Sequence, residues 1–346
     1  MGKLLSICIP TYTRKEKLVR LLENIAKEAR GLEGEVEACV SDNGSQDGTQ
    51  EYLEAARGKT KLKTNFYLSK TNDGFDLNVL RVLGLGEGKF LWLMGDDDLI
   101  AEGALRKLLE FLKELKNDSI KVIYLPSLSE EKGKLVPAIL PTSKTSSFHL
   151  VTEPIGFMSA IVYRKSALLG LDKKKVDRGL GNLYMHSWLL RIIGLTYLDG
   201  RAIYCPFPAC VSGGQDVVTN LARELKFSAL MTKQYASMLL LSLAHRRYLA
   251  YSLKKLLASF LFPFFEILCE RVFRDGKNEN LDFGFFRKQF GIFWGFPYFS
   301  RFVTRLTPLP LADLKLRAVL FFLKIFRLTP EPNYGFWKEF WTKGIQ

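Results

Sequence analysis

Three consecutive aspartates, Asp96, Asp97 and Asp98, directly follow an apolar stretch at residues 90–94 that we predict to be a buried strand. Adjacent carboxylates repel each other, so a folded protein keeps such a cluster where a divalent cation or another cationic group neutralises it. Carboxylate oxygens at a strand end suit Mg²⁺ or Mn²⁺. The alternative is an acidic turn that caps a helix beginning near Ala101, because Asp is favoured at helix N-termini. The triplet by itself favours neither interpretation.

The residues upstream of the triplet alternate short apolar stretches with helical patterns. We predict strands at residues 5–9, 36–40, 65–68 and 90–94. The first helical pattern places five apolar side chains on one face: Leu18, Leu21, Leu22, Ile25 and Ala29. Alternating strands and helices predict an α/β fold with a mostly parallel sheet covered on both faces. Ligands of such sheets bind at the carboxyl ends of the strands.

Polar clusters follow the other predicted strands at these ends. They comprise Pro10, Thr11 and Tyr12 after the first strand, Asp42 and Asn43 after the second, and Asn72, Gly74 and Asn78 after the third. Taken singly, the Asp-Asn-Gly and Asn-Asp-Gly segments are more often tight turns only, because these residue types reach positive φ at low cost. Their occurrence at successive strand ends favours one shared site instead.

The order and spacing of these segments resemble a known family. Residues 6–12, 41–45 and 95–98 look like the nucleotide-sugar-binding half of the inverting family 2 glycosyltransferases. They are most similar to the abequosyltransferase-like group that builds O-antigen, capsule and other surface glycans. The resemblance covers about residues 4–215. It implies a GT-A fold, in which a Rossmann-like domain with a mostly parallel sheet binds a nucleotide sugar.

The resemblance implies a donor-binding set and a metal-binding pair. Pro10, Thr11 and Tyr12 would form a wall beside the nucleotide base. Asp42, with Asn43 beside it, would accept a hydrogen bond from the imide N–H of uracil or a similar base. Asn72, Gly74 and Asn78 would lie along the nucleotide and the donor sugar, and Asp96 of the triplet completes the donor-binding set. A UDP-linked donor is therefore expected. Asp97 and Asp98 would bind the Mg²⁺ or Mn²⁺ that neutralises the diphosphate.

Three residues are candidates for the general base. Inverting transfer needs a carboxylate or imidazole within hydrogen-bond reach of the attacking hydroxyl. Residues 182–191 resemble the helix on which the family usually presents a Glu-Asp pair or a lone Asp, but this stretch has no acidic residue. His186 stands in or near that place, and an imidazole titrates near neutrality. Asp177 and Glu153 are the alternatives.

Two residues of this helix also have a structural interpretation. His186 would then be a helix histidine satisfied by neighbouring groups. Trp188 is expected to pack in the core rather than to stack on an acceptor sugar.

Other chemistries lack their sequence patterns. The three histidines show no metal-ligand spacing, and the chain has no Gly-x-Ser-x-Gly elbow and no phosphate-binding Gly-x-x-x-x-Gly-Lys loop. The five cysteines include no Cys-x-x-Cys pair, and the first apolar run is broken at Pro10, unlike a secretory signal. These features favour a cytosol-facing protein.

The composition changes sharply after about residue 220, which predicts a boundary between residues 1–220 and 221–346. The second region carries 20 Lys and Arg against 9 Asp and Glu, and it holds 19 of the 26 phenylalanines and three of the five tryptophans. Its apolar stretches are far shorter than the roughly 20 residues of a spanning helix. Amphipathic helices lying on an anionic membrane surface fit this composition.

The C-terminal region has two other interpretations. It could be a self-contained helical subdomain or an oligomer interface, and in either case its basic residues would form a solvated face. A nucleic-acid site is not expected, because no recognition motif accompanies the basic residues.

Together these features predict a metal-dependent inverting glycosyltransferase at the cytoplasmic face of a membrane, peripheral or monotopic. The donor is a nucleotide sugar and the expected acceptor is a lipid-linked saccharide, which would explain why a donor-binding domain is joined to a membrane-seeking region. Two alternatives stay open: a non-catalytic nucleotide-sugar-binding or scaffold protein, and a glycosyltransferase with a soluble acceptor.

Overall fold

A computed structural model of the chain describes residues 2–59, 61–131, 134–139, 157–181, 183–197 and 199–213. The chain divides into two units, Met1–Val217 and Val218–Gln346. All of the second unit lies outside the described residues, so the boundary near residue 220 and the helical region after it stay predictions. Glu153 also lies outside the described residues.

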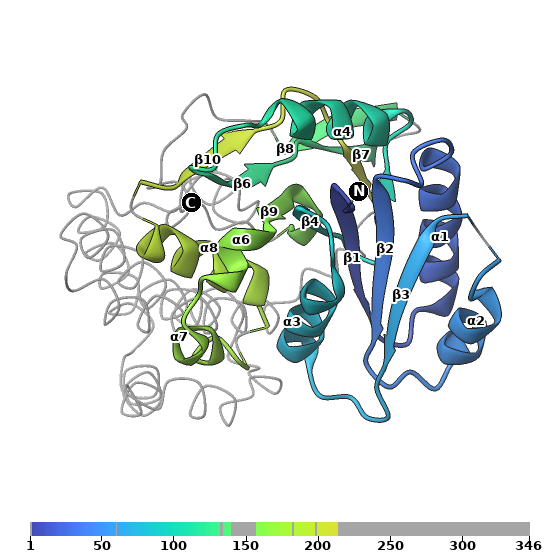
Figure 1. Ribbon diagram of the computed structural model, residues 1–346. Helices are drawn as coiled ribbons and strands as arrows, with labels where there is room; N and C mark the ends of the chain where they lie inside the picture. Colours follow the sequence, from blue (N-terminus) through green and yellow to red (C-terminus); the bar gives the residue numbers. More distant parts are fainter. Residues whose placement is uncertain are drawn as a thin grey trace, which may run out of the picture. The chain divides into compact units, whose positions relative to one another are not determined.

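A seven-stranded sheet with the strand order β10-β6-β9-β4-β1-β2-β3 forms the centre of the described unit (Figure 1). Its strands are β1 (Leu5–Thr11), β2 (Val36–Asp42), β3 (Lys63–Leu68), β4 (Phe90–Leu93), β6 (Ile120–Tyr124), β9 (Ile161–Arg164) and β10 (Arg201–Tyr204). Strands β1 to β4 are mutually parallel, as are β6 and β10, whereas β9 runs antiparallel to β4 and β6. The predicted α/β fold with a mostly parallel sheet is confirmed.

Helices lie on both faces of this sheet (Figure 1). They are α1 (Lys15–Glu28), α2 (Thr49–Ala56), α3 (Phe75–Leu85), α4 (Ala104–Glu114), α6 (Lys165–Leu169), α7 (Lys173–Asp177) and α8 (Met185–Thr196). Four of the five residues predicted to share the inner face of α1 are buried, namely Leu18, Leu21, Ile25 and the C-cap residue Ala29, and Leu22 is partly buried against the same core. Helix α3 packs on β1 and β2, and it also contacts α8.

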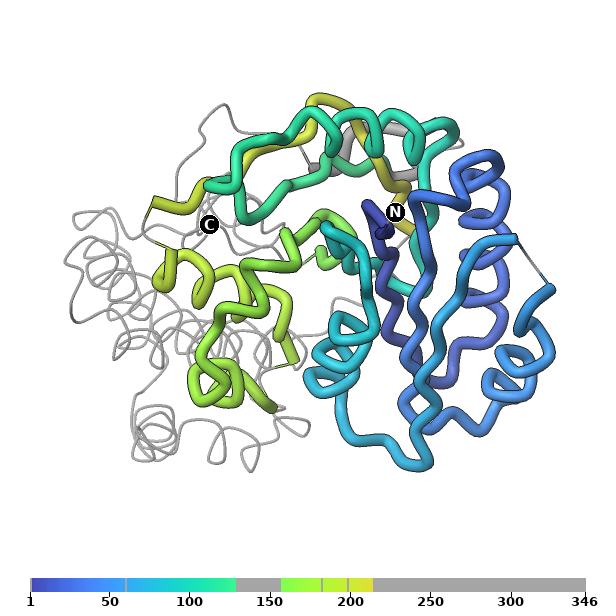
Figure 2. The backbone as a smooth tube through the Cα atoms, viewed as in Figure 1, coloured from blue at the N-terminus to red at the C-terminus, as the bar shows by residue number. Residues whose placement is uncertain are grey.

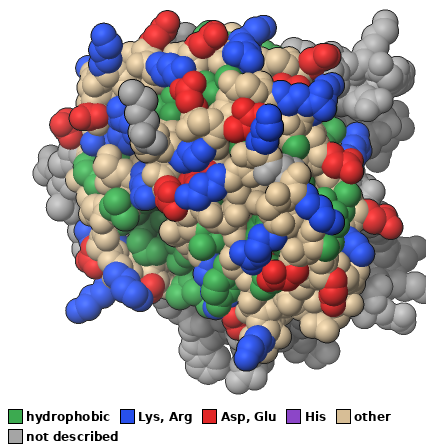
Figure 3. Space-filling model, turned by 45° about the vertical axis from the view of Figure 1, so that its right-hand side comes forward, with side chains coloured by type: hydrophobic (Ala, Val, Ile, Leu, Met, Phe, Trp, Pro, Cys, Tyr) green, Lys and Arg blue, Asp and Glu red, His purple; other side chains and the backbone are tan. Residues whose placement is uncertain are grey.

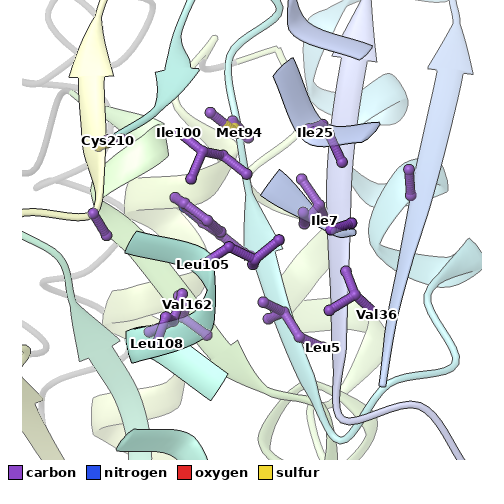
Figure 4. Close-up of a cluster of buried hydrophobic side chains, with 14 of the residues drawn as sticks. Leu5, Ile7, Ile25, Val36, Met94, Ile100, Leu105, Leu108, Val162 and Cys210 are labelled. Carbon is purple, nitrogen blue, oxygen red and sulfur yellow. The ribbon is translucent and has the colours of Figure 1, made fainter. Parts of the chain in front are cut away.

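Alternate residues of the central strands supply the core between the sheet and helices α1 and α4. Leu5 and Ile7 of β1 are fully buried in one cluster with Ile25 of α1 and Leu105 of α4 (Figure 4). Full burial of each such side chain contributes roughly 1.5–3 kcal/mol. This packing holds the parallel strands in register, so their carboxyl ends are held at one edge.

A second, four-stranded sheet has the order β5-β11-β7-β8. Its strands are β5 (Leu99–Ile100), β7 (Ser127–Glu131), β8 (Lys134–Ile139) and β11 (Cys210–Ser212). The helix expected near Ala101 begins only at Ala104, because β5 pairs antiparallel with β11 and Gly103 has a φ of 67°. Residues 99–103 thus separate the triplet from α4, so its interpretation as a helix cap is wrong.

The first 220 residues of the chain are nearly balanced in charge. Residues 1–220 hold 30 Lys and Arg against 27 Asp and Glu, so the formal net charge of +14 comes mainly from residues 221–346. Figure 3 shows one face on which basic and acidic side chains are interspersed. Within the described ranges, no helix combines the length and apolar character needed to cross a bilayer.

Candidate functional site

The carboxyl ends of β1, β2, β3 and β4 meet at one edge of the sheet because these strands are parallel. The triplet follows β4 and is tied to the end of β1, where the Thr11 hydroxyl donates a 2.7 Å hydrogen bond to Asp96. The end of β1 is tied in turn to the loop after β2, because the Asn43 N–H donates to the Thr11 carbonyl oxygen over 3.1 Å. Three of the predicted polar clusters therefore lie together.

Two cationic side chains, Arg14 and Lys17, lie against the triplet. Arg14 Nη1 is 3.0 Å from Asp96 Oδ1 and 3.0 Å from Asp97 Oδ2, and Lys17 Nζ is 3.8 Å from the same Asp97 oxygen. Burial holds the pKa of Asp96 above its usual range, while the Thr11 hydroxyl and Arg14 oppose this rise. Side chains at the start of α1 thus relieve part of the repulsion within the triplet.

Asp98 has a separate set of partners. The Ser159 hydroxyl donates to Asp98 Oδ2, and the Gly213 N–H donates to Oδ1 over 3.0 Å. The same Ser159 oxygen accepts a 2.8 Å hydrogen bond from the Gly95 N–H. Asp98 is 5% exposed, and burial raises its pKa to about 6 even though both hydrogen bonds lower it. The short helix η1 (Met158–Ala160), which carries Ser159 just before β9, therefore holds the third carboxylate.

Close packing around the triplet requires glycine at two positions. A Cβ at Gly95 would lie 2.8 Å from Asp98 Oδ2, and a Cβ at Gly213 would lie 1.7 Å from the Asp97 carbonyl oxygen. Gly213 comes directly after β11, and the yellow trace in Figure 2 shows this end of the described chain returning toward the β1 side of the sheet. A side chain at either glycine would displace the triplet.

The side chains around the triplet fit a cation that shares its ligands with a substrate. Among the described residues, no group of three or more His, Cys, Asp or Glu side chains is arranged to hold a metal ion. The Asp97 side chain is 30% exposed, and its Oδ2 faces Arg14 and Lys17. In Asp96 and Asp98, by contrast, both carboxylate oxygens accept hydrogen bonds from the protein. Mg²⁺ is usually held by one or two carboxylates together with substrate phosphates. Asp97 is the carboxylate of the triplet that is open to such a shared cation, and the predicted metal-binding roles of Asp97 and Asp98 both stay predictions.

Asp42 organises the loop that follows β2. Its buried carboxylate accepts hydrogen bonds from the Gly44 N–H (3.1 Å), the Ser45 N–H (3.0 Å), the Ser45 hydroxyl and the Gln50 side-chain amide (2.6 Å). Gln50 also donates to the Ser69 carbonyl oxygen over 2.8 Å, which joins this loop to the end of β3. The carboxylate is thus engaged by the protein's own donors, and its contact with a nucleotide base stays a prediction.

Asparagine side chains join the loops that follow β2 and β3. Asn43 Nδ2 donates to Asn72 Oδ1 over 2.8 Å, and Asn43 Oδ1 accepts from the Asp73 N–H over 3.1 Å. Asn72 Oδ1 also accepts from the Gly74 N–H over 3.0 Å. Gly74 has a φ of 92°, a conformation that favours glycine. Three predicted donor residues, Asn43, Asn72 and Gly74, therefore form one hydrogen-bonded unit.

The other predicted donor residues differ in exposure. Asn78 is buried in α3, where its side-chain carbonyl accepts from the Ser41 hydroxyl (2.6 Å) and its amide donates to the Thr11 carbonyl oxygen (3.2 Å). Both ends of this amide thus hold α3 against β1 and β2. Pro10 is buried in β1, whereas Tyr12 is 46% exposed. Tyr12 is the member of this group that presents a large side chain to solvent.

His186 lies in the first turn of α8 and is 3% exposed. Its ring centroid is 6.4 Å from that of Phe75 and 5.7 Å from that of Tyr184. Its carbonyl oxygen accepts a 2.8 Å hydrogen bond from the Tyr163 hydroxyl. The imidazole therefore packs among aromatic side chains in this structure, and its role as the general base stays a prediction.

Asp177 and Trp188 lie in neighbouring elements. Asp177 ends α7, where its carboxylate pairs with Lys173 over 2.8 Å on the exposed surface. Trp188 is fully buried, and its indole N–H donates to the Lys175 carbonyl oxygen over 3.0 Å. The expectation that Trp188 packs in the core is confirmed.

Four residues of this region were not singled out by the sequence: Arg14, Lys17, Ser159 and Asp76. Arg14 and Lys17 lie two and five residues after the Pro-Thr-Tyr segment, so basic residues soon after a strand end were the available signal. Ser159 had no sequence signal, because a serine 61 residues from its Asp98 partner shows no characteristic spacing. Asp76 accepts hydrogen bonds from the backbone of residues 183 and 185, another contact that only the fold reveals.

Comparisons with known proteins agree with this geometry. Residues 6–169 match the model of Glycosyl transferase family 2. Abequosyltransferase RfbV of Salmonella typhimurium is 36% identical over 133 residues, which make up 38% of this chain and 38% of that protein. Uncharacterized glycosyltransferase MG060 of Mycoplasma genitalium is 25% identical over 259 residues, or 68% of this chain and 85% of that protein. The crystal structure of Staphylococcus aureus TarS 1–349 in complex with UDP-GlcNAc superposes with a TM-score of 0.53 and 18% identity, covering 84% of this chain and 80% of that chain.

Residues 6–169 therefore match glycosyl transferase family 2, and the described unit has the GT-A fold. The family resemblance inferred from the segments at the strand ends is confirmed. The chain aligns with only 38% of the length of RfbV.

Proposed function

We propose that this protein transfers a sugar from a nucleotide-sugar donor to an acceptor hydroxyl, with inversion and in a single displacement. The observation that carries the proposal is the convergence of the strand-end loops at one edge of the sheet, tied together by the Thr11–Asp96 and Asn43–Asn72 hydrogen bonds. The carboxylates there are flanked by two cationic side chains, Arg14 and Lys17. The match of residues 6–169 to glycosyl transferase family 2 supports the same chemistry.

A UDP-linked sugar is the donor we infer. TarS of Staphylococcus aureus, a Poly(ribitol-phosphate) beta-N-acetylglucosaminyltransferase, is 30% identical to this chain over 133 residues, and one of its structures contains UDP-GlcNAc. In the present chain, the loop organised by Asp42 would receive the base. The joined loops that carry Asn43 and Asn72 would lie along the ribose and the sugar.

Neutralising the diphosphate is the task of the triplet region. When bound, Mg²⁺ or Mn²⁺ stabilises the negative charge of the leaving diphosphate. Asp97 would hold the ion, because its side chain is the most exposed of the three carboxylates in the triplet. Asp98 would join it only if the Ser159 or Gly213 hydrogen bond gave way. Arg14 and Lys17 would add positive charge beside the diphosphate, which makes the nucleotide a better leaving group.

The acceptor hydroxyl must lose a proton as it attacks the donor sugar. His186 is the first candidate for this base, with Asp177 and Glu153 as the alternatives. For the acceptor itself we propose a lipid-linked saccharide, used at the cytoplasmic face of a membrane. The basic and aromatic composition of residues 221–346 supports this placement.

A panel of nucleotide sugars, assayed with and without Mg²⁺ or Mn²⁺, tests this function. A ligand that binds only the folded state raises the melting temperature, so we expect a UDP-sugar with metal to raise it and to be hydrolysed slowly in the absence of acceptor. Asp97→Asn should remove the metal-dependent part of both effects. Glu54→Gln, which changes an exposed carboxylate in α2, is the matched control and should behave like the wild type.

The outcomes separate the alternatives. If no nucleotide sugar raises the melting temperature, the donor-binding function is wrong. A UDP-sugar that binds but is never hydrolysed or transferred would identify a non-catalytic binding protein. Full turnover of Asp97→Asn would remove the metal assignment while leaving the transferase intact.

A further inference from the structure

The first turn of α8 is capped from another helix. Its N-cap residue, Tyr184, does not cap the helix with its own side chain. Asp76, in the first turn of α3, accepts a 3.1 Å hydrogen bond from the Met185 N–H and a 3.0 Å hydrogen bond from the Leu183 N–H. A carboxylate at a helix N-terminus also interacts favourably with the helix dipole. Asp76 of α3 thus supplies the N-terminal cap that the side chain of Tyr184 does not provide for α8.

Two features indicate that this cap fixes the backbone conformation of Leu183. Leu183 has a φ of 57°, a left-handed conformation that costs a residue with a branched side chain about 1 kcal/mol. Such a conformation persists when its surroundings hold it in place, and the Leu183 N–H is held by Asp76. Asp76 is 4% exposed, so its two hydrogen bonds are shielded from competing water.

Asp76 also lies directly beside the donor loop in the chain. Only Phe75 separates it from Gly74, whose N–H is bonded to Asn72 in the joined loops described above. The Phe75 ring itself meets the ring of His186 edge-on, with centroids 6.4 Å apart. Residues 72–76 therefore contact the loop after β2 at one end and the first turn of α8 at the other.

We propose that Asp76 is a positioning residue that couples occupation of the donor loop to the first turn of α8, where His186 stands. A donor that orders residues 72–76 holds the Asp76 carboxylate in place, and the carboxylate in turn holds the backbone of Leu183 and Met185. The acceptor side of the site is thereby organised when the donor is bound. This inference depends on the proposed function, because it assumes that a nucleotide contacts the loop after β3.

Hydrogen exchange of the Leu183 and Met185 amides tests the coupling directly, because these amides are the groups that Asp76 binds. The full-length protein is measured with and without UDP plus Mg²⁺. In the wild type we expect UDP to slow exchange in peptides that contain these two amides by about fivefold or more, the lower end of typical coupling between sites. Asp76→Asn, which has nearly the same shape but no charge, should bind UDP within about threefold of the wild type yet lose this protection. Asp76→Glu should recover part of it.

Asp172→Asn is the matched control. Asp172 is also an aspartate at a helix N-terminus, where it accepts a 2.9 Å hydrogen bond from the Lys174 N–H, but it caps α7 and not α8. This variant should keep the full UDP-dependent protection at Leu183 and Met185. A purely structural cap at Asp76 would raise exchange equally with and without UDP, so the UDP-dependent difference is the decisive quantity.

Three results would overturn the inference. UDP binding to the wild type without added protection of the first turn of α8 removes the coupling but leaves the donor assignment intact. Equal UDP-dependent protection in Asp76→Asn and wild type shows that the coupling runs through other residues. Absence of UDP binding to the wild type overturns the proposed UDP donor and this inference together. If Asp76→Asn does not fold, the wild-type measurement can still overturn the coupling, and Asp76→Glu then tests the role of Asp76, because protection equal to that of the wild type in this variant would overturn it.

Discussion

Asp98 is a buried carboxylate whose charged form is disfavoured by its surroundings. Its pKa in the folded protein is about 6, against roughly 3.9 for an exposed aspartate. The folded protein therefore binds this proton more tightly than the unfolded chain does. The resulting stabilisation is present below about pH 4 and is lost as the pH rises through about 6. Asp98→Asn removes this titration, so its free energy of unfolding relative to wild type should rise by about 2–3 kcal/mol between pH 4 and pH 7.5.

Urea unfolding in EDTA at the two pH values measures this difference. Glu54→Gln is again the matched control, because its carboxylate is exposed and its relative stability should change little with pH. If the stability of Asp98→Asn relative to wild type were the same at both pH values, Asp98 would not retain its proton as the structure indicates.

Arg14 forms ion pairs with Asp96 and Asp97. Its removal should therefore destabilise the protein most at a pH at which both carboxylates are charged. We expect Arg14→Gln to lower the free energy of unfolding by about 1–2 kcal/mol at pH 7.5, because the buried Asp96 then loses its cation and, among the described residues, keeps the hydrogen bond from the Thr11 hydroxyl. The loss should shrink at acid pH, where Asp96 becomes protonated. Arg20→Gln changes an exposed arginine of the same helix and serves as the control. An equal loss in both variants would show that the ion pair adds nothing beyond net charge.

His186 has a catalytic and a structural interpretation that kinetics can separate. As the general base, His186→Ala should reduce turnover by about 10²-fold or more with little change in donor affinity. Because the ring is buried among aromatic side chains, the melting temperature of the variant must be measured alongside. If Asp177→Asn or Glu153→Gln shows the loss of turnover instead, His186 is structural and the base is reassigned.

The contact between α7 and α8 depends on a glycine. A Cβ at Gly179 would lie 2.1 Å from Trp188 Cδ1, closer than any real contact allows. Gly179→Ala should therefore lower the free energy of unfolding by about 1–3 kcal/mol, the usual cost of overpacking. Gly84→Ala is the matched control, because a Cβ there meets nothing within 4 Å and an alanine in α3 should stabilise by about 0.5–1 kcal/mol. Urea unfolding measures the free energy of unfolding of both variants. Similar values for the two would contradict the close contact between Gly179 and Trp188.

Local patterns predicted the elements whose partners are near in sequence. The strands at β1, β2, β3 and β4 and the inner face of α1 were visible as apolar runs and helical spacing. β5 was missed because two residues, Leu99 and Ile100, become a strand only by pairing with β11, more than a hundred residues later. The antiparallel course of β9 was likewise not predictable, because strand order and direction depend on pairing with β4 and β6 rather than on local pattern.

In the site, too, features set by local sequence were predictable and contacts between distant residues were not. The polar residues at the strand ends were predictable, because a parallel sheet brings those ends to one edge. Their partners were not: Arg14, Ser159 and Asp76 are ordinary polar residues until the fold places them beside a carboxylate or a helix start. The acidic triplet itself was ambiguous, since its sequence is compatible with either a cap or a site.

At the scale of the whole molecule, the two regions differ in composition, and this leads to a membrane prediction. Interfacial binding combines apolar burial with attraction to anionic lipid, so full-length protein should sediment with anionic vesicles more than with neutral ones, and less at high salt. Binding should fall, with nucleotide-sugar affinity unchanged, when four basic residues of the C-terminal region are replaced by Gln: Lys315, Arg317, Lys324 and Arg327.

The control for this experiment changes the same number of charges in the described unit. Four exposed basic residues there are replaced by Gln: Lys27, Lys59, Arg106 and Lys107. This variant should bind vesicles as well as the wild type does. Sedimentation that is equal with neutral and anionic vesicles, or absent with both, would favour a subunit interface for residues 221–346.

The position of Ser159 and Gly213 along the chain has a consequence for biosynthesis. These two residues hold Asp98, yet they are synthesised 61 and 115 residues after it. At translation rates of about 5–20 residues per second, the third carboxylate waits on the order of ten seconds for its last partner. Arg14 and Lys17 precede the triplet, so they are available to pair with Asp96 and Asp97 as soon as β1 and β4 meet. We therefore expect the emerging chain to neutralise its acidic edge with its own cations well before the sheet is complete.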